Sequence, residues 1–144
     1  MLLPDINALI YAHRSDGPEH ELFREWLVSL VTSPSPFGMS DFVMTGFVRI
    51  VTNRRIFSEP TPRPVAVGFL EELLGRANCV LVLPGARQWP LTVRLCEEAD
   101  ITGSMVSDAY LAALAIDHGC ELVTTDSDFA RFPGLRWSHP LAAR

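Results

Sequence analysis

The sequence predicts an α/β fold, a three-layer α/β/α sandwich with a mainly parallel central sheet. Short apolar runs alternate with helical patterns along the whole chain, which is the order expected when helices cover both faces of a parallel sheet. Neither a repeat nor a linker interrupts this order, and 144 residues are the size of one ordinary domain. We therefore expect residues 1–144 to form a single domain.

The composition is that of an ordinary globular protein, with 48% hydrophobic and 20% charged residues. No apolar run approaches the ~20 residues of a membrane span, and the N-terminus has no basic leader. We therefore expect a cytoplasmic protein without a membrane segment. Cys79, Cys96 and Cys120 are odd in number and form no CxxC pair, which indicates reduced core residues rather than disulfides or zinc ligands.

The formal net charge of −5 argues against a protein that is held to nucleic acid by its overall charge. A nuclease is still compatible with this value. An acidic cluster changes its local sign when it binds a divalent cation, and a separate basic patch can contact phosphates. All twelve basic side chains are arginine, the better bidentate partner for phosphate.

The first elements are expected to be a short strand over residues 1–4, an acidic turn at Asp5 and a helix over Asn7–Arg14. Because Pro4 cannot donate a ladder hydrogen bond, the strand should end there. A second amphipathic helix is predicted over Glu19–Val31. The proline-rich stretch that follows, up to Gly38, is interpreted as a break between elements.

Ser40 is predicted to cap a third helix that runs to about Thr52, with Asp41 in its first turn. Gly46 lies on one stripe of this helix and would let a backbone or a ligand approach closely, at a cost of ~1 kcal/mol in helix propensity. The next stretch, Asn53–Pro64, is predicted to be a loop. It carries three arginines that are candidates for RNA contacts, although a solvated surface loop is the more common role of such a cluster. They are Arg54, Arg55 and Arg63.

The middle of the chain is predicted to contain helices over Val65–Arg76 and from near Trp89 to Ala99, with a strand at Cys79–Leu83 between them. The continuous apolar run of this strand is typical of a parallel sheet that is covered on both faces. A loop over residues 100–106 follows, and a last short strand is predicted at Leu135–Ser138.

The chain is organised around residues 107–129, which are predicted to form a helix, a turn and a strand with a carboxylate at each end. Ser107 is expected to cap the helix, and Asp108 lies in its first turn, where the helix dipole favours negative charge. The strand, Glu121–Thr125, is followed directly by Asp126. Ligand sites in open α/β sheets form at such strand ends.

Three aspartates are therefore candidates for a shared site: Asp5, Asp108 and Asp126. If they converge at the carboxyl edge of one sheet, they form an oxygen-rich, anionic pocket, the ligand set that Mg²⁺ or Mn²⁺ prefers. Such a site can activate water and stabilise charge on a phosphodiester. Aspartate is equally common as a cap or turn residue, so each of the three also has an ordinary structural interpretation.

The ordered motifs resemble a PIN domain, and more closely a VapC-type toxin ribonuclease. The resemblance covers essentially the whole chain, and the order of the motifs is fairly specific although each is weak alone. The motifs are D-x-N at Asp5 and Asn7, FVRIVT at Phe47–Thr52, SDAYLAALA at Ser107–Ala115, LVTTDSDF at Leu122–Phe129 and the closing PGLRW.

This resemblance implies an α/β/α ribonuclease that uses Mg²⁺ or Mn²⁺ held by clustered acids. It also implies a cognate VapB-type antitoxin that blocks the site and, usually, a homodimer. Asp5 and Asp108 match the family's metal-binding aspartates, Asp126 matches a further acidic position, and Asp128 is a nearby candidate.

One position departs from the family pattern. PIN domains carry a glutamate in the third helix, and the residue that aligns best with it here is Gly46. Asp41 is the nearest acid in the sequence. Whether Asp41 replaces the missing carboxylate, and whether the site holds one metal ion or two, stays open at this point.

The leading hypothesis from the sequence is a Mg²⁺-dependent endoribonuclease in which Asp5, Asp108 and Asp126 hold the metal. The alternative is a catalytically degenerate PIN-like module that binds RNA or a protein without cutting, which Gly46 motivates. A small-molecule phosphohydrolase with Asp5 as nucleophile is weaker, because D-x-N lacks the second acid that such chemistry often uses.

Overall fold

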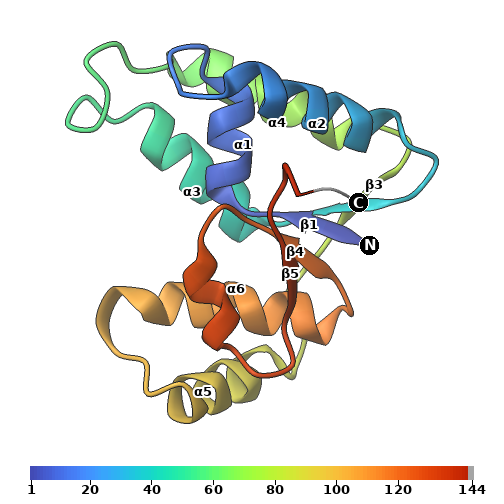
Figure 1. Ribbon diagram of the computed structural model, residues 1–144, viewed down its shortest axis with the longest axis vertical. Helices are drawn as coiled ribbons and strands as arrows, with labels where there is room; N and C mark the ends of the chain where they lie inside the picture. The colour runs from blue at the N-terminus through green and yellow to red at the C-terminus, as the bar shows by residue number, and fades with distance from the viewer. Residues whose placement is uncertain (143–144) are drawn as a thin grey trace.

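The computed structural model describes residues 1–142 and contains a five-stranded sheet in which every pair of neighbouring strands is parallel (Figure 1). The strands are β1 (Leu2–Pro4), β2 (Phe37–Met39), β3 (Cys79–Leu81), β4 (Glu121–Val123) and β5 (Arg136–Ser138). The helices are α1 (Ile6–His13), α2 (His20–Thr32), α3 (Asp41–Val51), α4 (Arg63–Leu74), α5 (Gln88–Glu98) and α6 (Val106–Asp117), with short 3₁₀ helices η1 (Gly103–Met105) and η2 (Ser127–Arg131).

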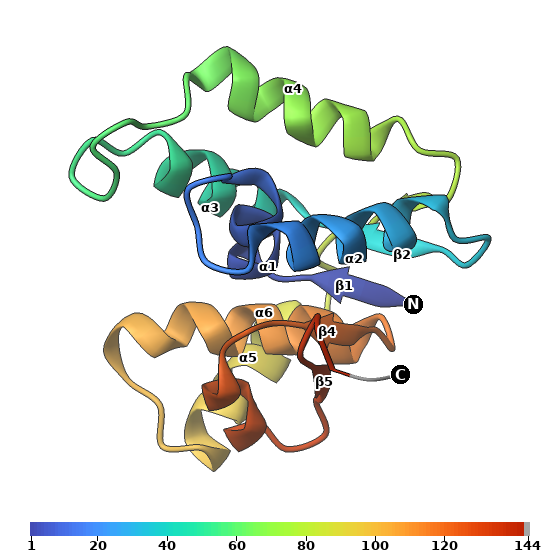
Figure 2. The same ribbon diagram turned by 45° about the horizontal axis from the view of Figure 1, so that its top comes forward.

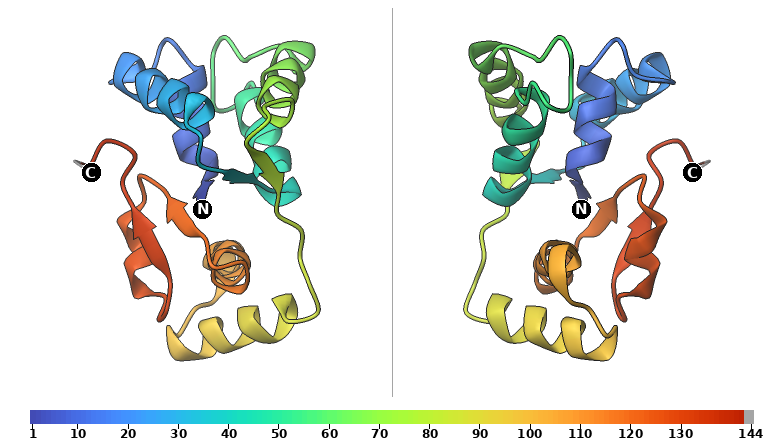
Figure 3. Two further views of the ribbon diagram at one scale, coloured as in Figure 1. Left: turned by 90° about the vertical axis from the view of Figure 1, so that its right-hand side faces the viewer. Right: turned by 90° about the vertical axis from the view of Figure 1, so that its left-hand side faces the viewer.

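The helices form two layers, one on each side of the sheet. Helices α1 to α4 lie together on one side, and α5 and α6 pack against each other on the opposite side (Figures 2 and 3). This arrangement confirms the predicted α/β/α sandwich with a parallel sheet. No helix within residues 1–142 is both long and apolar enough to cross a membrane.

The strand order is β3-β2-β1-β4-β5, so the side of the sheet to which the chain adds strands changes between β1 and β4. The chain first builds the sheet outward from β1 to β3, and then adds β4 and β5 on the other side of β1. Ligands of open α/β sheets bind outside the carboxyl ends of the strands at such a switch point. The residues that follow β1 and β4 therefore occupy the position where a site is expected.

Pro4 ends the central strand without breaking its ladder to β4. The Asp5 N–H donates to the Val123 carbonyl at 2.9 Å. Because the N–H groups of successive residues in a strand point in opposite directions, Pro4 turns its nitrogen toward β2. The β1–β2 register is set at the other end of the strand, where Leu2 lies opposite Phe37. The missing donor therefore removes no bond from the β1–β4 pairing.

Helix α6 is buried almost all round, which the helical spacing of its apolar residues did not indicate. Leu111, Ala112 and Ala115 follow at the spacing of one inward face, but Ala109, Ala113 and Leu114 are also at most 1% exposed. The reason is that α6 lies between the sheet and α5, so opposite sides of the helix face different neighbours. Its many alanines let both neighbours approach closely.

Strand β2 begins in the stretch that is predicted to be a break between elements, so that prediction is wrong. A three-residue strand of Phe37, Gly38 and Met39 directly after Pro34 and Pro36 carries little local signal. Gly38 is needed there because a Cβ atom would lie 2.8 Å from a methyl group of Val82. The strand forms because β1 and β3 pair with it on either side.

Two further features differ from the prediction, the place of β3 in the sheet and the start of α4. Strand β3 is an edge strand rather than one covered on both faces, since Val80 and Leu81 are 42% and 48% exposed. An apolar run indicates a strand but not its place in the sheet. Helix α4 begins at Arg63, so the loop before it is shorter than predicted and Arg63 is helical, with Pro64 tolerated in the first turn.

Candidate functional site

Three neighbouring strands end at one edge of the sheet and deliver polar residues there. Asp5 follows β1, Ser40 and Asp41 follow β2, and Thr124 begins the segment after β4 that leads to Asp126. Ser40 caps α3 as predicted, because its hydroxyl accepts a hydrogen bond from the Val43 N–H at 3.3 Å. The candidate site is built on this edge.

Asp5 is the most enclosed acid of the site, at 5% exposure. One of its carboxylate oxygens accepts a hydrogen bond from the Ile6 N–H at 2.6 Å. The other accepts from the Thr124 hydroxyl at 2.7 Å and from the Asn7 side-chain amide at 2.9 Å. Burial raises the pKa of Asp5, the hydrogen bonds from Thr124 and Ile6 oppose this rise, and the negative charge of Asp126 adds to it.

Asn7 and Thr124 join the ends of β1 and β4 into one rigid unit. The Asn7 side-chain amide also donates from its nitrogen to the Thr124 hydroxyl oxygen at 3.1 Å, and its Oδ1 accepts a hydrogen bond from the Thr125 N–H at 3.1 Å. The Asp126 N–H donates to the Thr124 hydroxyl at 3.0 Å. Thr124 is not among the site residues predicted from the sequence, where its place in the T-T-D segment is its only local signal.

Asp108 lies in the first turn of α6, as predicted, but Ser107 does not cap this helix. The 3₁₀ helix η1 runs directly into α6, whose N-cap position is Met105, so Ser107 is already inside the first turn. Burial, followed by the charges of Asp126 and Asp5, raises the pKa of Asp108 to about 6. These effects outweigh the helix dipole, which favours the charged form.

Asp126 and Asp128 lie at the start of η2, after β4. Asp126 is the N-cap of this 3₁₀ helix and accepts a hydrogen bond from the Asp128 N–H at 2.8 Å. Asp128 is exposed and faces Arg131 at 3.5 Å. Its charge still contributes to the raised pKa of Asp108, whereas Asp41 is not among the largest contributors. Asp128 is therefore the further acid whose charge reaches Asp108.

We call Asp5, Asp108, Asp126 and Asp128 the acidic cluster. Within residues 1–142 no arginine forms an ion pair with the first three of them. No three His, Cys, Asp or Glu side chains of the same residues converge tightly enough to form a ready-made metal site. Like charges disfavour close approach unless a cation lies between them, so the donor set still suits a hard divalent cation.

An open groove of about 810 Å³ begins at Asp5 and Asp108 and runs between α3 and α6. Helix α3 contributes one side, with Asp41 at the rim, and the first turns of α6 contribute the other. Asp126 and Asp128 do not line this groove and lie beside its acidic end. The complete set of lining residues is Asp5, Ile6, Asp41, Phe42, Thr45, Gly46, Arg49, Ser104, Ser107, Asp108, Tyr110 and Leu111.

Gly46 is buried against Ile6, so any side chain at this position would displace the end of the Ile6 side chain. A Cβ atom at Gly46 would lie 2.3 Å from the terminal methyl group of the Ile6 side chain, and 3.1 Å from the next carbon. Ile6 therefore fills the space that a longer side chain at position 46 would need. The sequence predicted a close approach at Gly46, and the approaching group is a side chain of α1.

The predicted RNA-contact arginines lie outside the groove. Arg54 and Arg55 are exposed in the loop after α3, and Arg63 is exposed at the start of α4. Arg49, which is not among the predicted RNA contacts, lines the groove from the last turn of α3. Its signal in the sequence is its helical spacing from Phe42.

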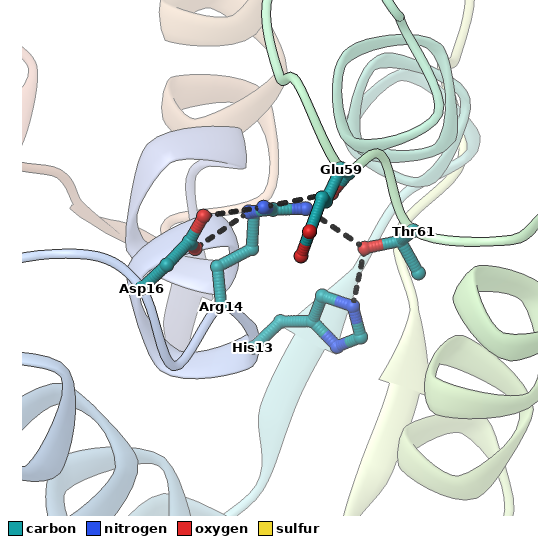
Figure 4. Close-up of polar contacts among 5 residues, drawn as sticks. All are labelled: His13, Arg14, Asp16, Glu59 and Thr61. Carbon is teal, nitrogen blue, oxygen red and sulfur yellow. Dashed lines mark hydrogen bonds and ion pairs between the residues drawn. The ribbon is translucent and has the colours of Figure 1, made fainter.

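A buried arginine holds the loop that carries Arg54 and Arg55. Arg14 donates hydrogen bonds to the Asp16 carboxylate (Nε to Oδ1, 2.9 Å), to the Glu59 carbonyl (3.0 Å) and to the Thr61 hydroxyl (3.3 Å) (Figure 4). Its guanidinium also lies 3.8 Å from the centre of the Phe57 ring. We call this set of contacts the Arg14 anchor. It fixes both the turn after α1 and the loop before α4.

The chain matches the family model of the PIN domain over residues 2–135. It is 41% identical over 140 residues to ribonuclease VapC25 of Mycobacterium tuberculosis, an alignment that covers 97% of this chain and 99% of that protein. It is also 41% identical over 141 residues to VapC ribonuclease Mb2897 of Mycobacterium bovis, with 98% and 96% coverage.

Solved structures share the fold at lower sequence identity. VapBC2 from Rickettsia felis, bound to a DNA fragment of its promoter, matches with a TM-score of 0.69 and 20% identity over 96% of this chain and 97% of that chain. VapC20 of Mycobacterium tuberculosis, a toxin that cleaves the sarcin-ricin loop, matches with a TM-score of 0.66 and 15% identity over 94% and 99%.

Proposed function

The chain belongs to the PIN domain family, and from this premise we propose that it is a VapC-type endoribonuclease that depends on Mg²⁺ or Mn²⁺. One observation supports the proposal most strongly. The acidic cluster lies at the switch point of the sheet, burial and then the charges of the cluster raise the pKa of Asp108 to about 6, and no arginine within residues 1–142 pairs with Asp5 or Asp108. Unpaired, mutually repelling carboxylates of this kind suit a divalent cation.

Asp5, Asp108 and Asp126 would hold the metal in this proposal, and Asp128 is the further acid beside them. A bound cation would activate water and stabilise the charge that develops on a phosphodiester. The chain's own residues prepare the site. Thr124 and Asn7 orient the Asp5 carboxylate through neutral donors, which leaves its negative charge intact for a cation.

The curated relatives are named ribonucleases, and several structural neighbours are VapBC complexes. We propose accordingly that the substrate is RNA and that a cognate VapB-type antitoxin neutralises the activity. We also propose a homodimer and a cytoplasmic location, both from the resemblance to VapC-type proteins. Co-expression tests the partner: the chain alone should halt growth, and the product of the adjacent gene should restore it.

The test of the activity is cleavage of RNA by the purified protein. With Mg²⁺ it should cut total cellular RNA or a structured transcript, and EDTA should stop the reaction. The Asp108→Asn variant should be inactive although it keeps the shape of the side chain. If the variant cuts RNA as fast as the wild type, the assignment of Asp108 is wrong.

A second candidate function is a PIN-like module that binds RNA or a protein without cutting it. The observation that favours it is Ile6, whose side chain occupies the space beside Gly46, the position where the family's glutamate would stand. Titration calorimetry with Mn²⁺ at near-neutral pH separates the two functions. Binding that Asp108→Asn abolishes supports the nuclease, and no detectable binding supports the module.

A further inference from the structure

The groove between α3 and α6 has an aromatic wall next to its acidic end. Phe42 comes from α3 and Tyr110 from α6, and their ring centres are 5.2 Å apart with the ring planes tilted by 31°. Both residues line the groove, and both are only half-buried. Phe42 directly follows Asp41, and Tyr110 lies two residues after Asp108, so the same helical turns present acids and rings.

This aromatic pair differs from the pairs that only fill the core. Phe47 and Phe69 stack at the same centroid distance, 5.2 Å, but Phe47, which belongs to α3, is completely buried. Phe42 and Tyr110 instead form part of an open surface. In addition, the Tyr110 hydroxyl has no hydrogen-bond partner among the residues that the structure describes, so it is available to a ligand in the groove.

The backbone beneath the pair is held in place from outside the groove. Gln88, which is buried at the start of α5, donates a hydrogen bond from its side-chain amide to the Tyr110 carbonyl at 2.8 Å. This bond joins α5 to α6 directly behind the ring. A preorganised ring loses little conformational freedom when a flat ligand stacks on it.

A positively charged side chain, that of Arg49, lines the same groove from α3, further along the helix from Asp41. Arg49 follows Phe42 by seven residues, or two helical turns, which corresponds to about 10 Å along the helix axis. It is exposed, and it forms no ion pair with any of residues 1–142. The groove thus presents acids, an aromatic wall and an unpaired arginine.

We propose that this groove binds one nucleotide of a single-stranded RNA segment, with its base stacked on the Phe42–Tyr110 pair and a flanking phosphate at Arg49. Aromatic side chains stack on any base because every base has a π face, and arginine is the preferred partner of phosphate. The inference rests on the proposed ribonuclease function and adds to it the subsite that places RNA beside the acidic cluster.

The experiment uses a short single-stranded RNA that carries 2-aminopurine, whose fluorescence is quenched when the base stacks. Binding to the full-length protein is measured in EDTA, so that no cleavage occurs. Loss of one stacking partner should weaken binding about tenfold in Phe42→Leu and in Tyr110→Leu and should remove the quenching. Tyr110→Phe should keep the quenching, because the ring remains.

Trp89→Leu is the matched control, since Trp89 is 68% exposed at the start of α5 and does not line the groove. It should bind the RNA as the wild type does. Arg49→Gln should weaken binding, reduce its dependence on salt and leave the quenching of bound RNA unchanged. Thermal unfolding of each variant establishes that the half-buried rings were removed without loss of the fold.

The outcomes separate this inference from the proposed function. Wild-type affinity and quenching in folded Phe42→Leu and Tyr110→Leu would overturn the subsite, while Mg²⁺-dependent cleavage would still support the nuclease. Loss of RNA binding in these variants, together with full cleavage by Asp108→Asn, would support the subsite and overturn the metal site. If the variants bind RNA normally but are no longer inhibited by the antitoxin, the rings contact the protein partner and the inference is overturned. A wild type that binds no RNA would also overturn the inference.

Discussion

The acidic cluster and the Arg14 anchor both contain an enclosed charged side chain, but only in the anchor is the charge paired with an opposite charge. The Arg14 side chain is 9% exposed and its charge is matched by Asp16, so it serves the fold (Figure 4). Asp5 is 5% exposed, but its hydrogen bonds come only from neutral donors, among them the Thr124 hydroxyl. Neutral donors orient a carboxylate without cancelling its charge. The difference indicates which charges the molecule keeps for a ligand.

The largest expected effect tests this difference with one substitution type at two sites. In Asp5→Asn, Mg²⁺-dependent cleavage should fall by about a hundredfold or more, because a charged ligand contributes several kcal/mol to a metal-assisted step. In Asp16→Asn, the rate should stay within about twofold of the wild type, as expected for an exposed residue away from the site. Initial rates on one RNA substrate measure both. Equal losses would remove the distinction between the two clusters.

The next effect concerns the neutral donor that orients Asp5. Thr124→Val keeps the shape of the fully buried side chain but deletes the hydroxyl, and loss of such an outer-shell partner lowers metal affinity about 10- to 100-fold. Thr124→Ser restores the hydroxyl and should restore most of the affinity. Calorimetric titration with Mn²⁺ gives the dissociation constants, and equal affinities for the Val and Ser variants would contradict the role of the hydroxyl.

The Arg14 anchor should respond in stability rather than in metal binding. Arg14→Ala removes hydrogen bonds to Glu59 and Thr61, and we expect it to lower the free energy of unfolding by about 1–3 kcal/mol. Urea unfolding measures this loss, and limited proteolysis should show faster cleavage between residues 53 and 62. The control is Arg54→Ala, an exposed arginine of the same loop, which should stay within about 0.5 kcal/mol. Mn²⁺ affinity should be unchanged in both variants.

The smallest expected effect is the dependence of stability on pH. The pKa of Asp108 is raised to about 6, and that of Asp5 is raised as well. Between about pH 4 and pH 6 the folded protein therefore binds more protons than the unfolded chain, so in EDTA its free energy of unfolding should fall as the pH rises. Asp108→Asn should flatten this slope and raise the melting temperature at pH 7 by about 3 °C.

Added Mn²⁺ should reverse the trend, because it binds the deprotonated carboxylates. The melting temperature of the wild type should rise with Mn²⁺ at pH 7 and change little at pH 4. Thermal scans across this pH range, with and without the metal, measure the effect. A slope of the same size in Asp108→Asn would show that other groups carry it.

Local signals predicted the elements that position the candidate acids. The turn after a short strand placed Asp5, the first helical turn placed Asp108, and the end of the next strand placed Asp126, each within a few residues of its observed boundary. Ser40 was identified as a helix cap for the same reason, because its partner, the Val43 N–H, is three residues away. Interactions of this range can be inferred from the chain alone.

Tertiary structure decided the features that depend on distant segments. Strand β2 exists because two neighbouring strands pair with it, and β3 is exposed because it lies at the edge of the sheet. The space beside Gly46 is occupied by the side chain of Ile6, which comes from another helix. The groove and its aromatic wall form only where α3 meets α6, and neither helix indicates the other in its own sequence.

The sequence by itself determined the order of the elements, the fold class and the acids that stand at the ends of strands and the starts of helices. Only the folded chain showed that Thr124 orients Asp5 from 119 positions away, and that the charges of Asp126 and Asp128 reach Asp108 while Asp41 lies at the groove rim. The physical reason is one of range. Caps, turns and helical periodicity act over a few residues, whereas the orientation and the pKa of a carboxylate depend on whichever distant groups the sheet brings beside it.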